Sequence, residues 1–243
     1  MEELLEKAKE LRRAVLKLAA ETGEVHLGGS FSEIEILFSL YSSILKGQDK
    51  FILSKGHAYA PLYLLLKEKG LNPKFSGHPD IDIENGIYCT TGSLGHGLPT
   101  GAGMAFARKL KKQDGKIYVL ISDGECQEGT TWETSEFACH HKLDNLKVIL
   151  DYNKIQALDA INKVITSDYN EKFKVFGWHV DEIDGHNFNQ LTSVLKKETP
   201  GKPHLIIANT VKGKGVSYME NSAMWHSRPM TKDELNRAYW ELK

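Results

Sequence analysis

Two polar residues stand where apolar, strand-like runs of the sequence come to an end. Asp123 follows the run 117–121 after one intervening serine, and Asn153 closes the run 148–153, 30 positions further on. That distance leaves room for one crossover helix, and parallel strands present ligands at their carboxyl ends. A carboxylate and an amide oxygen at one sheet edge suit magnesium, which usually also takes phosphate oxygens.

The residue after Asp123 adds to this pattern. Gly124 lets the chain turn tightly, and backbone N–H groups at the start of a following helix can meet phosphate oxygens. Asp-Gly is also a common turn dipeptide. The spacing by itself therefore leaves open both a magnesium–diphosphate site and an ordinary turn with a loop asparagine.

The elements that would position these residues alternate between helices and apolar strands. Strands are expected at 51–54, 117–121, 148–153, 180–183 and 205–209. Helices are expected over 1–20, from Ser30 with Glu33 at capping-box spacing, over 58–68, over 101–107, from Thr130 with Glu133, and from Thr231 with Glu234. The glycine-rich segment 76–103 is expected to be a loop whose backbone approaches another group closely. This order predicts an α/β fold with a parallel sheet covered by helices on both faces. Without a linker, it predicts one domain over 1–243.

Composition excludes several classes of protein. Lys plus Arg number 31 against 32 Asp plus Glu, for a net charge of −1, and 41% of residues are hydrophobic. These values exclude disorder as the main state and argue against a nucleic-acid partner. Three widely spaced cysteines predict neither a disulfide framework nor a structural zinc site. The charged, helix-patterned start and the short apolar stretches predict a cytoplasmic protein with no signal peptide and no membrane span.

Five strings, in their order along the chain, resemble the transketolase family. They are FILSKGHA (51–58), GHPD (77–80), TGSLGHG (91–97), DGECQEG (123–129) and DYNKI (151–155). Asp123-Gly124 followed by Asn153 also resembles the thiamine diphosphate motif, with Ser122 in place of its first glycine. The resemblance covers nearly the whole chain and implies a thiamine-diphosphate-binding fold. Because a full-length enzyme continues into a pyrimidine-binding and a C-terminal domain, the chain resembles the N-terminal, diphosphate-binding subunit of a split transketolase.

The resemblance also implies a cofactor and the residues that would hold it, thiamine diphosphate with Mg²⁺ (Ca²⁺ or Mn²⁺ as substitutes). It assigns the metal to the side chains of Asp123 and Asn153 and the carbonyl of Ile155. Glu128 would stabilise the cofactor site and its pairing across subunits. The residues it places along the cofactor are Gly124 and His57 at the diphosphate, His226 returning to the diphosphate from a late loop, and Gly92, Ser93 and Leu94 near the aminopyrimidine.

Three histidines are implied to face substrate hydroxyls and to relay protons: His26, His78 and His226. His26 follows Glu24-Val25, where the family more often has Ser-Gly before the histidine. Two other departures are Ser93 where Pro is common and His96 where Gln is common. The remaining histidines match no motif and are expected to be structural: His140, His141, His179, His186 and His204. Lys212 and Lys214 could clamp phosphate, but a solvated basic loop is the favoured interpretation.

The implied reaction is the transfer of a two-carbon ketol unit from a ketose phosphate to an aldose acceptor, as in pentose phosphate metabolism. The glutamate that activates the cofactor belongs to the pyrimidine domain, so this chain would hold half of each active site. The expected partners are sugar phosphates, a C-terminal transketolase subunit, and a second copy of the chain in an α2β2 assembly.

Two alternatives remain. One is a subunit of another thiamine diphosphate enzyme, either deoxyxylulose phosphate synthase-like or 2-oxoacid dehydrogenase-like; the string 54–58 and His78 favour transketolase over both. The other is a non-catalytic regulatory paralogue, against which Asp123, Asn153, His57 and Glu128 argue.

Overall fold

A parallel sheet forms the centre of the computed structural model, which describes residues 2–157 and 159–243. Its strands are β1 (Lys50–Leu53), β2 (Ile117–Ser122), β3 (Leu146–Tyr152), β4 (His179–Asp184) and β5 (His204–Asn209). They lie in the order β1-β2-β3-β5-β4, and every neighbouring pair is parallel. The predicted parallel α/β sheet is therefore confirmed, with each expected strand present.

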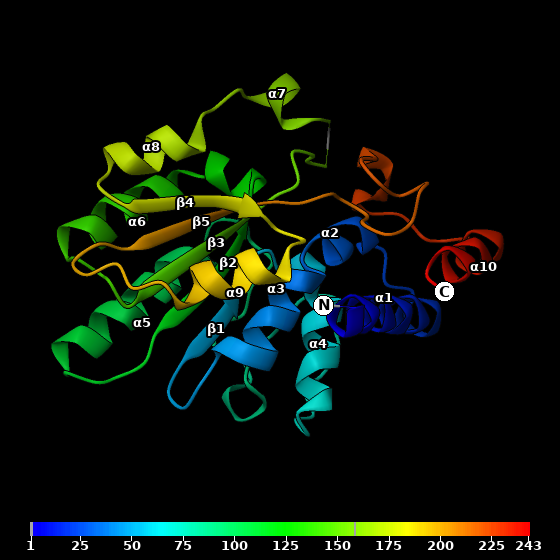
Figure 1. The fold of residues 1–243 in the computed structure, drawn as a ribbon, viewed down its shortest axis with the longest axis horizontal. Helices are drawn as coiled ribbons and strands as arrows, with labels where there is room; N and C mark the ends of the chain where they lie inside the picture. Colours follow the sequence, from blue (N-terminus) through cyan, green and yellow to red (C-terminus); the bar gives the residue numbers. More distant parts are fainter. Residues whose placement is uncertain (1, 158) are drawn as a thin grey trace.

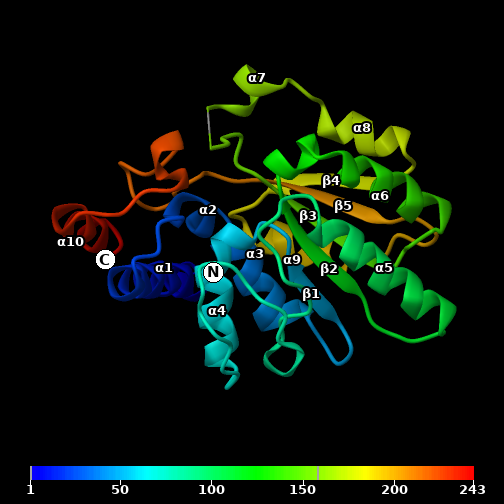
Figure 2. The same cartoon turned by 180° about the vertical axis from the view of Figure 1, so that it is seen from behind.

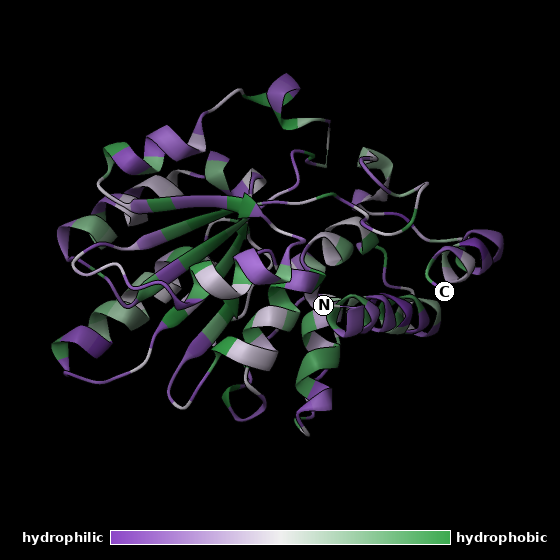
Figure 3. Ribbon diagram, viewed as in Figure 1, coloured by the Kyte–Doolittle hydropathy of each residue, from purple (hydrophilic) through white to green (hydrophobic). Residues whose placement is uncertain are grey.

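Helices cover the sheet on both faces (Figures 1 and 2). The hydrophobic core on one face includes residues of α2 (Leu27–Ser32), α3 (Ile34–Ser39), α4 (Tyr59–Glu68) and α9 (Phe188–Lys196), and α1 (Glu2–Thr22) packs against α2, α3 and α4. The other face packs against α5 (Gly97–Leu110), α6 (Gly129–His140) and α8 (Tyr169–Val175). Figure 3 shows hydrophobic residues running along the central strands. Every residue of β2 is buried, whereas the edge strand β4 is only partly covered. Continuous apolar strands are what burial on two faces requires.

Shorter elements connect these layers. They are the π-helix η1 (Leu40–Ile44), the 3₁₀ helices η2 (Gly56–Ala58), η3 (Ile83–Asn85), η4 (Gly124–Gln127) and η5 (Ala223–His226), and the helices α7 (Ile161–Val164) and α10 (Lys232–Glu241). Within the described ranges, no helix is both long and apolar enough to cross a bilayer.

One of the three predicted capping boxes forms. Thr231 caps α10 with Glu234 in a reciprocal box. The predictions at Ser30 and Thr130 are wrong. Ser30 lies inside α2, where its hydroxyl donates to the carbonyl of His26, and the Thr130 hydroxyl donates to the carbonyl of Gly95. The Ser30 hydroxyl is thus taken by a local bond to the carbonyl four residues earlier, and the Thr130 hydroxyl by a partner distant in sequence. Helix α5 also begins at Gly97, four residues before the expected range.

A buried ion pair joins α1 to α3. Arg12 Nη1 lies 2.8 Å from Glu35 Oε1, and Arg12 also donates to the Phe31 carbonyl at 3.1 Å. His186, in the loop after β4, places Nδ1 2.9 Å from Glu35 Oε2. Burial opposes ionisation of Glu35, but the His186 hydrogen bond and the Arg12 charge outweigh it and lower the pKa to about 2. Glu35 is therefore charged and pins three segments together.

Replacing Arg12 should test the contribution of this ion pair to stability. Arg12→Ala leaves the Glu35 carboxylate buried with a much weaker partner, so the free energy of unfolding should fall by about 3–5 kcal/mol. Urea denaturation followed by circular dichroism measures the loss. Arg13→Ala is the matched control, because Arg13 is 30% exposed in its ion pair with Glu6, and it should cost less than about 1 kcal/mol. Equal losses in the two variants would contradict the role of Arg12.

Candidate functional site

A cavity of about 240 Å³ opens at the carboxyl ends of β2 and β3. It brings together most of the residues that the sequence nominated: His57, Leu94, Asp123, Gly124, Glu128, Asn153, Ile155 and His226. Gly29, Lys55, Ser122, Gln127, Gln156, Ala157 and Lys212 complete its lining. Four nominated residues lie outside that lining: His26, His78, Gly92 and Ser93. Glu128 is exposed at the rim.

The nominated metal ligands come from two adjacent strand ends. Asp123 is 2% exposed, and its Oδ2 accepts from the backbone N–H of Lys154 at 2.8 Å. Lys154 has a φ of 67°, a left-handed turn directly after β3. The Ile155 N–H then donates to Asn153 Oδ1 at 3.1 Å. Burial and the charge of Asp151 raise the pKa of Asp123 to about 7. A buried carboxylate held in this way favours a bound cation.

Lys212 supplies positive charge to the same cavity. It is 2% exposed, and its Nζ donates to the Ile155 carbonyl at 3.0 Å and lies 3.0 Å from His226 Nδ1. Burial and the nearby Lys55 charge lower its pKa to about 8. The prediction of a solvated basic loop is thus wrong for Lys212, because the segment after β5 folds back under η5. Lys214 agrees with that prediction, since its side chain is 39% exposed.

The cavity lining also suits an anion. Gln156 contributes a buried Nε2 that has no hydrogen-bond partner among the described residues. An unpaired buried donor costs free energy unless a ligand satisfies it. Lys212 and this amide therefore offer donors to phosphate oxygens, while Asp123, Asn153 and the Ile155 carbonyl offer hard oxygens to a divalent cation. The residues present fit a metal–diphosphate group.

Below the cavity lies an ion cluster that the sequence analysis did not identify. Lys55 pairs with Asp151 and lies 3.1 Å from Glu33 Oε2, and all three side chains are 1% exposed or less. Lys55 and Asp151 lie in strings that resemble the transketolase family, but the sequence analysis gave neither residue a role. It predicted that Glu33 forms a capping box, because nothing in the neighbouring sequence indicates that Glu33 is buried against Lys55.

Glu125 is a further residue that the sequence analysis missed. Its carboxylate accepts from the Ser54 hydroxyl, from Gly95 N–H at 3.0 Å and from Ser122 N–H at 2.9 Å. Burial raises its pKa. Because these partners lie after β1, before α5 and at the end of β2, Glu125 clamps three loops around the cavity.

Four histidines gather beside the cavity although they come from distant parts of the chain. The His26 ring lies 5.6 Å from His57, 5.9 Å from His78 and 6.1 Å from His226, and the His57 and His226 rings are 5.2 Å apart. Burial lowers the pKa of His57 well below its usual range and that of His226 to about 4. These two imidazoles are therefore neutral at physiological pH.

Two glycines make this histidine group possible. A Cβ on Gly28 would lie 2.6 Å from the Trp225 carbonyl oxygen, so only glycine lets η5 bring His226 toward α2. Gly92 has a φ of 142°, and a Cβ there would lie 3.1 Å from the His78 ring. Gly92, nominated to line the cofactor, thus packs against a histidine in this chain.

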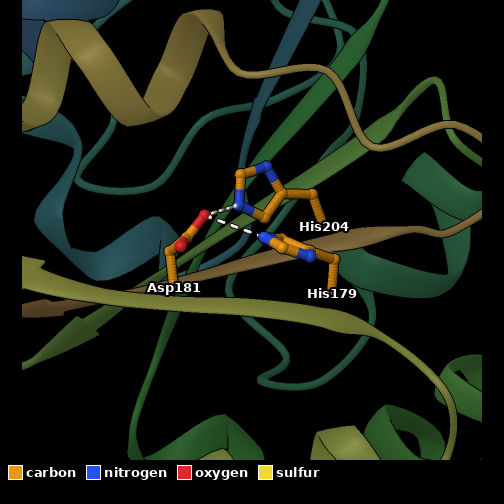
Figure 4. A group of neighbouring side chains, drawn as sticks. All are labelled: His179, Asp181 and His204. Carbon is orange, nitrogen blue, oxygen red and sulfur yellow. Dashed lines mark hydrogen bonds and ion pairs between the residues drawn. The ribbon is translucent and has the colours of Figure 1, made fainter.

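A separate histidine group lies at the amino ends of β4 and β5 (Figure 4). His179 Nε2 and His204 Nε2 lie 3.1 Å and 2.9 Å from the same oxygen of Asp181. Lys197 Nζ lies 2.9 Å from both oxygens of that carboxylate. Because an ammonium already balances the carboxylate, we assign this group a structural role at the sheet edge, as expected for both histidines.

The fold and the cavity define an α/β protein that binds a phosphorylated ligand at the carboxyl edge of a parallel sheet. Residues 26–242 match the family model described as transketolase, thiamine diphosphate binding domain. The chain belongs to the transketolase family and corresponds to its thiamine-diphosphate-binding domain.

Relatives of two kinds match the chain. It is 38% identical to an apulose-4-phosphate transketolase subunit of Actinobacillus succinogenes, covering 100% of this chain and 96% of that protein. It is 35% identical to the 6-deoxy-6-sulfo-D-fructose transketolase subunit SqwG of a Clostridium species, covering 99% of this chain and 96% of that protein. Among solved structures, transketolase of Campylobacter jejuni superposes with a TM-score of 0.88 at 28% identity, covering 99% of this chain but 43% of that one. The chain thus matches subunits at nearly full length and spans about two fifths of that single-chain transketolase.

The lowered pKa of Lys212 leads to a stability prediction. Lys212→Met removes a desolvated cation, so the free energy of unfolding without ligand should rise at pH 7 by about 1–3 kcal/mol. The unfolded chain keeps its lysine protonated up to its usual pKa of 10.5. The gain is therefore full below about pH 8 and disappears as pH rises toward 10.5. Urea titrations at several pH values measure it.

Lys214→Met is the control for this change, because its side chain is 39% exposed and its loss should leave stability nearly unchanged. A fall in the free energy of unfolding for Lys212→Met would show that the Lys212 ammonium stabilises the protein without ligand, which contradicts this prediction.

Proposed function

We propose that this chain, folded as one domain over 1–243, is the diphosphate-binding subunit of a two-chain transketolase. The assembly would transfer a two-carbon ketol unit from a ketose phosphate to an aldose. The observation that carries the proposal is one cavity where Asp123, Asn153 and the Ile155 carbonyl converge with Lys212 beside four histidines. The names of the subunit relatives support the same division into two chains.

The cavity residues would divide between metal and diphosphate. Asp123, Asn153 and the Ile155 carbonyl would hold Mg²⁺, for which Ca²⁺ or Mn²⁺ could substitute. Gly124, His57, His226 and Lys212 would contact the diphosphate. Leu94 on the lining, with Gly92 and Ser93 beside it, would face the aminopyrimidine. Bound thiamine diphosphate supplies the electron sink that side chains lack.

The histidines would handle protons. His26 and His78 lie outside the cavity lining but next to His57 and His226, so they occupy the side from which a sugar would approach. An imidazole exchanges protons near neutral pH, which suits catalysis at substrate hydroxyls. His226 would serve both the cofactor and the substrate.

The remaining part of each active site would come from a second chain. The activating glutamate and the pyrimidine pocket belong to domains that follow this one in single-chain family members. Glu128, exposed at the cavity rim, would stabilise pairing between subunits. An α2β2 assembly in the cytoplasm with a C-terminal transketolase subunit follows from the resemblance and from the prevalence of two-fold symmetry.

Asp123→Ala should abolish metal-dependent cofactor binding, because it removes the charged metal ligand. Isothermal titration of thiamine diphosphate into the assembled complex, with and without Mg²⁺, measures the effect. Asp233→Ala, at an exposed position of α10, is the matched control and should bind normally. Wild-type affinity in Asp123→Ala would refute the metal assignment.

Activity should require both chains. The purified chain should fold but show no ketol transfer with thiamine diphosphate and Mg²⁺, since it lacks the activating glutamate. Mixing it with its C-terminal partner should restore turnover, measured by coupled oxidation of NADH after aldose formation. Robust turnover by this chain alone, with mass spectrometry excluding a contaminating partner, would overturn the half-site proposal.

A further inference from the structure

We infer that Glu24 is a positioning residue that holds His26 with its proton on Nδ1, leaving Nε2 as the proton acceptor at the substrate side of the site. The inference deepens the proposed function and rests on it for its catalytic consequence. Glu24 is absent from the cavity lining and carries none of the roles assigned above.

One oxygen of Glu24 gathers three N–H groups. Glu24 Oε1 accepts from Val25 N–H and His26 N–H, each at 2.7 Å, and lies 2.9 Å from His26 Nδ1. The Glu24 side chain is 3% exposed. Within residues 2–157 and 159–243, its ion-pair contact is with His26 and with no lysine or arginine. The carboxylate is thus directed at one backbone turn and one imidazole.

These contacts decide the tautomer of His26. An ionised carboxylate only accepts hydrogen bonds, so the facing Nδ1 must carry the proton. Burial opposes ionisation of Glu24, yet the hydrogen bonds from His26 outweigh it, and the net effect lowers the Glu24 pKa. In the neutral imidazole, Nε2 then holds the lone pair, and the His26 side chain keeps 20% exposure through which a substrate could reach it.

The other groups that face His26 are the imidazoles of His57, His78 and His226, the last with Lys212 behind it. Glu24 is the one anion in this set, so its carboxylate is the acceptor that fixes which nitrogen of His26 carries the proton.

Glu24→Gln separates charge from hydrogen bonding, because the amide oxygen can still accept the same N–H groups. Nitrogen-15 NMR of histidine-labelled, full-length chain should show His26 as the Nδ1–H tautomer in wild type. The hydrogen bond from Nδ1–H should weaken when a neutral amide replaces the carboxylate, so the Nδ1–H proton resonance should move upfield in Glu24→Gln. Glu21→Gln, the same change at an exposed position of α1, is the control and should move neither quantity.

Kinetics of the complex with its partner provide the second measurement. Glu24→Gln should lower kcat about tenfold and leave the affinity for thiamine diphosphate unchanged. The Nε2–H tautomer of His26 in wild type, an unchanged Nδ1–H resonance in Glu24→Gln, or a wild-type kcat in that variant would overturn the inference. Absence of ketol transfer in the wild-type assembly would refute the proposed function instead, and the NMR result alone would then decide whether Glu24 positions His26.

Discussion

A lysine ammonium buried between one carboxylate and one carboxyl group supports the carboxyl edge of this sheet. Lys55 follows β1, Asp151 lies in β3, and Glu33 joins α2 to α3. Removing such charges from water costs several kcal/mol for each ion, and hydrogen bonds offset that cost for Lys55 and Asp151, whereas both oxygens of Glu33 have no hydrogen-bond partner among the described residues. Lys55 donates to the Gly29 carbonyl at 3.0 Å, and Asp151 accepts from the hydroxyls of Ser32 and Thr210. Lys55 is two residues from His57, and Asp151 is two residues from Asn153. The contacts of the cluster therefore also position His57 and Asn153.

The charge state of the cluster shapes the cavity above it. Burial raises the pKa of Glu33 to about 8, while Lys55 and two hydroxyls lower that of Asp151 against its own burial. At neutral pH the cluster thus holds one cation, one anion and one mostly neutral carboxyl group. The two charged members act on the cavity directly, because the Asp151 charge raises the pKa of Asp123 and the Lys55 charge lowers that of Lys212. The proposed metal and diphosphate would bring opposite charges into neighbouring positions beside these two groups.

The cavity stores unfavourable interactions that ligands would relieve. Asp123 is a buried carboxylate held by one backbone N–H, Lys212 is a buried ammonium that contacts a carbonyl and a neutral imidazole, and the Gln156 amide has no partner among the described residues. Such groups lower the stability of the protein without ligand and increase the affinity for a group that satisfies them together. Stability and binding are therefore opposed in this region, and the burial of apolar side chains on both faces of the sheet offsets the cost.

The sequence by itself determined the strands, their parallel arrangement and the position of Asp123 and Asn153 at neighbouring strand ends, because apolar runs and strand-end residues are local signals. It also nominated the histidines, through motifs. Only the tertiary structure decided that Glu33 pairs with Lys55 instead of capping a helix, that Lys212 is buried, and that Glu24 reaches His26. A carboxylate or ammonium has the same local sequence signature whether it meets water or a buried partner. Its partner is chosen by chain segments that are distant in sequence and are brought together only when the sheet and its helices pack.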